Sequence, residues 1–255
     1  MSESREKGKG CIMKRFTITR IFAVLLAIFL VALFTGYAVA QAPATIAPAP
    51  QGDESRVARH KAINERVKKG NVDLIFIGDS ITQGWEGPGK DTWEKYYAKR
   101  NAVNLGISGD QTQHVLWRLE NGNIEGISPK LAVIMIGTNN ASDNTAEEIA
   151  KGIKAIVNKL REKLPQTKIL LLAVFPREEK PGALRAKLTK ANKIISGLAD
   201  GKMVHFVDIG PKFLEKDATL PKSIMPDALH PNTKGYEIWA DAIEPKVAEL
   251  MGEKK

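Results

Sequence analysis

The stretch VDLIFIGDSITQGW, residues 72–85, is an apolar run that ends abruptly in Gly78, Asp79 and Ser80. Because VDLIFIG is apolar without strict alternation, it predicts a strand buried on both faces, as in a parallel sheet covered by helices. A serine directly after such a strand is often the cap of the next helix. It can instead be a nucleophile that the strand delivers to the edge of the sheet. The motifs in the other segments of the chain distinguish between these two interpretations.

Four more short segments share the composition of this strand, and helical patterns separate them. The further predicted strands are residues 102–106, 130–137, 168–175 and 203–210. Apolar residues recur at steps of three and four in residues 145–164, in 184–198 and after Asn232, as amphipathic helices require. Thr145 and Glu148 have the spacing of a capping box. This alternation predicts a three-layer α/β/α sandwich around a five-stranded parallel sheet.

The N-terminal part of the chain has the layout of an export signal. Residues 21–40 are apolar and uncharged, follow three basic residues and end in the small-residue sequence AVA. They predict a signal peptide over residues 1–40, with cleavage before Gln41 and an exported, periplasmic or secreted, mature chain. The alternative is an uncleaved membrane anchor, because about twenty apolar residues can span a bilayer. The Pro/Ala-rich residues 41–54 predict an extended tether, followed by one domain over 55–252.

Cysteine usage and charge exclude several kinds of function. The single cysteine, Cys11, precedes the apolar segment, so the mature chain has no disulfide, thiol nucleophile or thiolate metal site. The net charge is +9, and the first forty residues contribute six Lys/Arg against two Asp/Glu, which leaves +5. These basic residues are interspersed with acidic ones, which favours a solvated surface and no nucleic acid partner. The apolar segment is then the only predicted contact with a membrane, and Met13 is an alternative start.

Polar and glycine residues follow the predicted strands at the edge where such sheets bind ligands. Ser80 follows the first strand, Gly109 the second and Asn139 the third. Asp227 and His230 stand three residues apart shortly before the last helix, a spacing that places both side chains on one side of a helical turn. We therefore expect these five residues to meet at the carboxyl edge of the sheet.

Together these residues are the components of acyl transfer chemistry. His230 can take the proton of the Ser80 hydroxyl while Asp227 fixes the orientation of the imidazole. The N–H groups of Ser80 and Gly109 and the side-chain amide of Asn139 can stabilise the oxyanion. The chain contains no G-x-S-x-G elbow, no phosphate-binding or dinucleotide fingerprint and no His, Asp and Glu cluster with metal-ligand spacing. The sequence therefore predicts neither a cofactor nor a metal.

Taken in order, four short blocks resemble the GDSL or SGNH hydrolase family. These blocks are Gly78-Asp79-Ser80, the segment around Gly109, Gly137-Thr138-Asn139 and Asp227-x-x-His230. Within that family, the segment NLGISGDQTQHVLWRLENG is similar to the catalytic subunits of platelet-activating factor acetylhydrolases, although Ser108 replaces a glycine that is common there. The resemblance implies a flavodoxin-like sheet, a metal-free serine esterase and pairing into a homodimer. It makes Ser80 the nucleophile, Gly109 and Asn139 oxyanion donors, and Asp227 and His230 the rest of the triad.

The expected function is an exported serine esterase that hydrolyses short acyl esters, above all O-acetyl groups. Short connections without a long apolar insertion leave no lid for a fatty chain, and export favours a carbohydrate ester or another small ester as substrate. The same site also suits a lysophospholipase, a thioesterase or an acyltransferase. A glycan-binding module that has lost catalysis is the non-enzymatic alternative.

Other residues near these segments have structural interpretations. His60 is expected at the surface, His114 on a helix face and His205 in the core. Asp79 is expected to make a structural hydrogen bond, and Arg177 to form a surface ion pair or to meet an anionic substrate. Three aromatic residues after the nucleophile either line the site or pack in the core: Trp85, Trp93 and Tyr96.

Overall fold

The computed structural model describes residues 43–253, and these form one compact unit around a five-stranded parallel sheet. The strands occur in the order β2-β1-β3-β4-β5, as the flavodoxin-like prediction requires. Their bounds are β1 Leu74–Gly78, β2 Ala102–Asn104, β3 Leu131–Met135, β4 Lys168–Leu172 and β5 Val204–Val207. The predicted signal peptide, residues 1–40, lies outside the described residues.

Strand β1 lies inside the sheet, paired with β2 on one side and β3 on the other. Phe76 is aligned with Asn104 of β2 and with Val133 of β3. All five residues of β1 and all five of β3 are buried, which explains why these segments are apolar without alternation. The chain leaves β1 toward β2 and returns to β3, so a crevice for ligands is expected between the carboxyl ends of β1 and β3.

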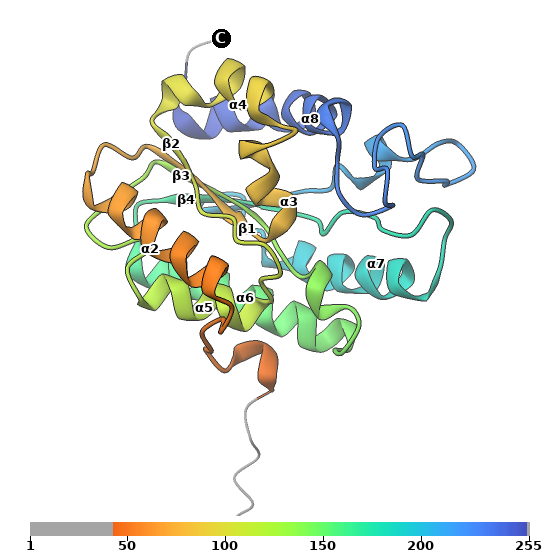
Figure 1. Cartoon of the computed structure of the whole chain (residues 1–255), viewed down its shortest axis with the longest axis horizontal. Coiled ribbons are helices and arrows are strands. Elements are labelled where there is room, and N and C mark those ends of the chain that lie inside the picture. Colours follow the sequence, from red (N-terminus) through yellow and green to blue (C-terminus); the bar gives the residue numbers. More distant parts are fainter. Residues whose placement is uncertain (1–42, 254–255) are drawn as a thin grey trace, which may run out of the picture. The chain divides into compact units, whose positions relative to one another are not determined.

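Helices cover both faces of this sheet. Helices α5 (Thr112–Glu120), α6 (Ala146–Lys163) and α7 (Ala183–Ile195) lie on one side, and α4 (Lys90–Tyr96) and α8 (Thr233–Met251) lie on the other (Figure 1). Helix α2 (Glu54–Lys68) contacts β2, and the short α3 (Ser80–Gln83) follows β1. Six short 3-10 helices complete the described elements: η1 Ala44–Ile46, η2 Gly84–Glu86, η3 Ala98–Arg100, η4 Thr138–Asn140, η5 Ser196–Leu198 and η6 Gly210–Phe213.

Local sequence signals set the ends of these helices. The predicted capping box of α6 is confirmed, because the Glu148 carboxylate accepts from the Thr145 N–H at 2.8 Å and the Thr145 hydroxyl accepts from the Glu148 N–H. Helix α8 begins after Asn232, whose side chain accepts from the Gly235 N–H at 3.1 Å. This cap fixes where the segment that carries His230 ends, and so it helps to place that segment.

The aromatic residues after Ser80 pack in the core rather than around a ligand. Trp85 is fully buried, with its ring centroid 4.8 Å from that of Trp239 in α8. Phe76 of β1 packs against Trp93 at 5.1 Å, while the Tyr96 hydroxyl donates to Asp241. Fully burying a large apolar side chain such as that of Phe76 contributes about 1.5–3 kcal/mol. Trp93 and Tyr96 are partly buried and pack against the same core. The core interpretation of these aromatics is therefore the one that the structure supports.

Two expectations for histidines are wrong. His205 is only partly buried, because β5 is an edge strand and its residues after Val204 lose the cover that central strands have. His60 is half-buried rather than at the surface, because its ring packs on Trp117 of α5 at 5.0 Å. The burial of His60 lowers the pKa of its imidazole.

The expected extended tether is also wrong for the part of it that the structure describes. Residues 43–53 pack on the domain: Thr45 is fully buried, and its carbonyl oxygen accepts from the Thr112 hydroxyl at 2.9 Å. Further along, the Ala49 N–H donates to the carbonyl oxygen of Gln113. Across residues 43–253 no helix combines the length and apolar character needed to cross a bilayer.

Candidate active site

Ser80 lies where β1 passes directly into α3, at the carboxyl edge of the sheet. A side chain at Gly78 would place its first carbon 2.1 Å from the Thr82 hydroxyl oxygen and 2.3 Å from the Met135 carbonyl oxygen. Only glycine therefore fits the end of this strand. Ser80 is the first residue of α3, so its own N–H has no partner within the helix and remains available to a ligand.

Asp79 makes the structural hydrogen bond that the sequence predicts. It is the N-cap of α3, and its Oδ1 accepts from the Ile81 N–H at 3.0 Å. Its other oxygen is buried and has no hydrogen-bond partner among the described residues. Burial raises the pKa of the Asp79 carboxyl to about 7, and the nearby Asp110 carboxylate adds to this rise while the Ile81 hydrogen bond opposes it. A carboxyl group that titrates near neutral pH therefore lies beside the candidate nucleophile.

Asp227 and His230 form a hydrogen-bonded pair that reaches Ser80. His230 Nε2 lies 2.9 Å from the Ser80 hydroxyl oxygen, and His230 Nδ1 lies 2.6 Å from Asp227 Oδ2. Asp227 Oδ1 accepts from the N–H groups of Leu229 and His230, which folds the segment into a tight turn. Burial alone would raise the pKa of Asp227, but the hydrogen bonds from the His230 side chain and backbone hold it below its ordinary value. Asp227 is therefore an ionised acceptor for the imidazole near neutral pH.

The loop after β2 carries Gly109, which adopts a positive φ of 77°. This conformation, together with an Arg56 guanidinium 2.7 Å from where a side-chain carbon would lie, explains why glycine occupies this position. The Gly109 N–H donates to no other described residue. The loop is anchored from the side of α3, because the Ser108 N–H donates to the Gln83 side chain at 2.8 Å.

Asn139, in η4 after β3, is hydrogen-bonded to the same loop. Its Nδ2 donates to the Asp110 carbonyl oxygen at 2.9 Å, and its own carbonyl oxygen accepts from the Gln111 side chain at 3.0 Å. An amide nitrogen has two hydrogens, so one N–H of Asn139 remains for a ligand while the other holds the loop. Gly109 and Asn139 thus follow different strands, and hydrogen bonds between Asn139 and the two residues after Gly109 hold these segments together.

This arrangement can carry out nucleophilic acyl chemistry. A hydroxyl group, an imidazole and a carboxylate are joined in sequence by hydrogen bonds, as activation of a serine nucleophile requires. Three N–H donors lie on the loops that follow β1, β2 and β3. Among residues 43–253 no group of three or more His, Cys, Asp or Glu is arranged to hold a metal ion. The five residues singled out in the sequence all lie at one edge of the sheet.

The other sequence candidates have different surroundings. His114 lies in the first turn of α5, as expected for a helix-face residue, and its Nδ1 accepts from the Gln111 N–H at 3.0 Å. Burial lowers the pKa of His114. Arg177 makes no ion pair within the described part of the chain and instead donates to the carbonyl oxygen of Thr138 at 3.0 Å, so the expected surface ion pair is wrong. Arg177 therefore supports the backbone just before Asn139.

A buried ion pair that was not predicted from the sequence lies beneath the loop after β2. Asp110 is fully buried, and its Oδ2 accepts from Arg118 Nε of α5 at 2.7 Å. Arg118 also donates to the side chain of Asn123 and to the carbonyl oxygen of Gly78, directly before Asp79. The motif GDQ, which begins at Gly109, was the one available signal, since an acidic residue among buried segments requires a partner.

Comparison with known proteins assigns the family. A sequence model of the GDSL-like lipase/acylhydrolase family matches residues 76–238. The chain belongs to this family. It is therefore a hydrolase that acts on ester bonds, and its resemblance to this family is confirmed.

Relatives with known names match most of this GDSL-like chain. The cattle (Bos taurus) platelet-activating factor acetylhydrolase IB subunit alpha1 is 39% identical over 202 residues, which are 79% of this chain and 86% of that protein. The rat (Rattus norvegicus) subunit alpha2 is 37% identical over 204 residues, 80% and 88% of the two chains. Acetylhydrolase subunits are thus among the proteins to which this hydrolase is similar.

Solved structures share the fold at lower identity. A putative platelet activating factor protein from Streptococcus pneumonia gives a TM-score of 0.64 at 24% identity, covering 75% of this chain and 92% of that one. Axe2, an acetylxylan esterase from Geobacillus stearothermophilus, gives a TM-score of 0.57 at 22% identity, covering 72% and 96%. The predicted α/β/α sandwich is therefore confirmed by the sheet and by these neighbours.

Proposed function

We propose that this chain hydrolyses short acyl esters, above all O-acetyl esters, with Ser80 as nucleophile and His230 and Asp227 completing a triad. The observation that supports this most is the continuous row of hydrogen bonds from Ser80 Oγ through the imidazole to Asp227, at 2.9 and 2.6 Å. In such a row the carboxylate keeps the imidazole in the tautomer that presents an unprotonated Nε2 to the hydroxyl.

The reaction follows from the positions of these groups. The Ser80 oxygen forms a bond to the ester carbonyl carbon as its proton passes to His230 Nε2, and the carbonyl oxygen becomes an oxyanion. The N–H groups of Ser80 and Gly109 and the free N–H of Asn139 stabilise this charge. His230 then gives the proton to the departing alcohol, which leaves an acyl group on Ser80. Water attacks that acyl group with His230 again as base, releasing the acid and restoring the serine.

Two features support a short acyl group. The connections that follow β1, β2, β3 and β4 at the carboxyl edge of the sheet are short. The longer connection after β5, residues 208–232, buries its apolar side chains Phe213, Leu220 and Met225 in the domain and leaves them unable to shelter a fatty chain. Relatives that cover most of the chain are named acetylhydrolases. We propose that the alcohol part of the ester is a carbohydrate, because the apolar residues 21–40 predict export with cleavage before Gln41. N-terminal sequencing of the exported protein should begin at Gln41, whereas an intact N-terminus in the membrane fraction would support an anchor.

The test is hydrolysis of p-nitrophenyl acetate, butyrate and octanoate by residues 41–255. Activity should be highest on acetate and fall with chain length, and Ser80→Ala and His230→Ala should remove it. Two matched controls replace the same residue types outside the site: Ser196→Ala in η5 and His205→Ala in the edge strand. Both should retain wild-type rates.

Other outcomes would replace the proposal. Faster turnover of octanoate than of acetate would indicate a lysophospholipase or a thioesterase. Transfer of the acyl group to a sugar hydroxyl in preference to water would indicate an acyltransferase. Equal rates for the wild type and Ser80→Ala on every ester would contradict the role of Ser80 and favour a glycan-binding module.

A further inference from the structure

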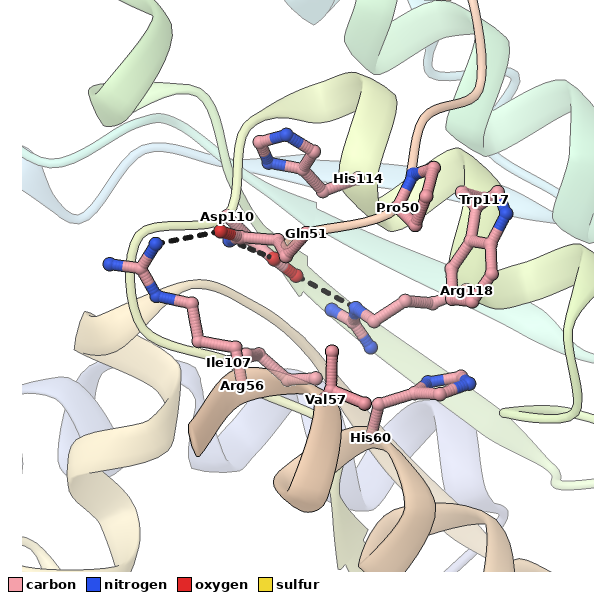
Figure 2. A pocket seen from close by; sticks show the side chains of 10 residues that line it. All are labelled: Pro50, Gln51, Arg56, Val57, His60, Ile107, Asp110, His114, Trp117 and Arg118. Atoms are coloured by element: carbon pink, nitrogen blue, oxygen red, sulfur yellow. Dashed lines mark hydrogen bonds and ion pairs between the residues drawn. The ribbon is translucent and has the colours of Figure 1, made fainter. Parts of the chain in front are cut away.

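The segment that precedes the domain runs past the loop that carries Gly109. Thr45 packs against α6, where a side chain at Gly152 would lie 2.9 Å from the Thr45 carbonyl oxygen. The Ala49 N–H then donates to the Gln113 carbonyl oxygen at the start of α5. These contacts bring the next residues of the segment, Pro50 and Gln51, to the wall of a small pocket beside Asp110 (Figure 2).

Gln51 joins this segment to the loop through both ends of its amide. Its Nε2 donates to Asp110 Oδ1 at 2.7 Å and lies 3.4 Å from the Ser108 carbonyl oxygen. Its Oε1 accepts from Arg56 Nη1 at 2.8 Å. Figure 2 shows Arg56, Gln51 and Asp110 in one connected row. Gln51 therefore contacts the residues on both sides of Gly109, and Arg56 packs against Gly109 itself.

Asp110 connects this row to the other donors of the site. Its second carboxylate oxygen accepts from Arg118, which also donates to the carbonyl oxygen of Gly78 before the nucleophile turn. Its backbone carbonyl oxygen accepts from the Asn139 side chain. The orientation of the Asp110 side chain thus affects the position of Gly109, to which Asp110 is bonded directly. It also affects the position of Asn139, which is hydrogen-bonded to the Asp110 backbone. We call the hydrogen bonds that Gln51 makes with Asp110 and Arg56 the Gln51–Asp110 clamp.

From these contacts we infer that Gln51 is a positioning residue for the oxyanion donors, an inference that rests on the proposed function. Gln51 touches no atom of the triad and acts through Asp110. Oxyanion donors stabilise the transition state only when they are held in place before the reaction, and a displacement of about 1 Å can lower the rate about a hundredfold. The clamp supplies that restraint from a segment whose composition alone predicts an extended tether.

The position of the clamp relative to the predicted processing site is consistent with this role. Cleavage before Gln41 leaves the whole of residues 43–53 on the mature chain. A neutral amide also suits the position, because it donates to the Asp110 carboxylate and accepts from the Arg56 guanidinium at the same time. An aliphatic side chain of similar size would fill the space and make neither hydrogen bond.

The test compares Gln51→Leu with Gln166→Leu, a matched change at an exposed position between α6 and β4, away from the carboxyl edge of the sheet. For Gln51→Leu we expect kcat on p-nitrophenyl acetate to fall about ten- to a hundredfold, while KM stays within about twofold. Affinity for a trifluoromethyl ketone, which forms a tetrahedral oxyanion on a serine, should fall in proportion to kcat/KM. The thermal midpoint of Gln51→Leu should lie about 2–10 °C below that of Gln166→Leu, because the buried Asp110 loses one hydrogen bond but keeps Arg118 as its partner.

Three results would overturn the inference. One is an unchanged kcat in Gln51→Leu. Another is a loss of activity that only follows a loss of folded protein. The last is a rise in KM at constant kcat, which would mean that Gln51 binds the substrate rather than positions the loop. If the wild type and Gln166→Leu are themselves inactive on every ester, the proposed function fails instead, so the two failures can be told apart.

Discussion

Replacing Asp79 by Asn should remove a large pH dependence from the stability of the protein. The Asp79 carboxyl is fully buried, and burial raises its pKa from 3.8 to about 7. Asn keeps the oxygen that accepts from the Ile81 N–H, so the cap of α3 is retained. The substitution therefore changes the titration of this site with little change to the local structure.

The sign and the size follow from the difference between the two pKa values. Between about pH 4 and pH 7 the folded protein holds a proton that the unfolded chain has released, so the free energy of unfolding falls as pH rises. Each pKa unit corresponds to about 1.4 kcal/mol, so a rise of roughly three units makes this loss on the order of 4 kcal/mol. Below pH 4 both states are protonated, so the pH dependence ends and the stability that this group contributes is fully present.

Urea unfolding of the wild type and of Asp79→Asn from pH 4 to pH 8 measures this effect. The wild type should lose stability relative to the variant as pH rises, and the difference should level off above pH 7. Asp91→Asn, an exposed position in α4, is the matched control and should run parallel to the wild type. A difference between the wild type and Asp79→Asn that is the same at pH 4 and pH 8 would mean that folding does not raise the pKa of the Asp79 carboxyl.

Three further substitutions test other parts of the site. Asp227→Asn should lower kcat about a hundred- to ten-thousandfold, because the His230 imidazole loses the acceptor that fixes its tautomer; an unchanged kcat would remove Asp227 from the triad. Asn139→Ala should lower kcat about a hundred- to a thousandfold with little change in KM, and a change in KM alone would argue against an oxyanion role. Arg118→Met should cost about 3–5 kcal/mol in urea unfolding by leaving the Asp110 carboxylate buried without its partner. Adding Asp110→Asn should recover part of that loss, and no recovery would mean that the pair is not the cause.

Much of the fold could be predicted because its signals are local. The buried strands appear as short apolar runs, and the capping box of Thr145 and Glu148 lies within four residues. The meeting of Ser80, Asn139 and Asp227 at one edge could be anticipated as well, because parallel strands bring their carboxyl ends together. The spacing and types of these residues were sufficient even though they come from distant segments.

The features that could not be predicted depend on contacts between distant residues, which leave no pattern in the local sequence. Gln51 and Asp110 are 59 residues apart, and a single side-chain hydrogen bond between them cannot be read from a Pro/Ala-rich segment. The partial exposure of His205 depends on β5 lying at the edge of the sheet. The sequence of one strand does not show where that strand lies in the sheet. His60 was misplaced for a similar reason, since Trp117, which partly covers it, belongs to another helix.

The most direct test of the proposed nucleophile is covalent labelling with diethyl p-nitrophenyl phosphate, followed by intact mass measurement and peptide mapping. We expect a single diethylphosphoryl group on Ser80 and no labelling of Ser80→Ala. Labelling of His230→Ala should be much slower, because the hydroxyl then lacks its base. Labelling at another residue, or equal labelling of the wild type and Ser80→Ala, would contradict the claim that Ser80 is the nucleophile of this hydrolase.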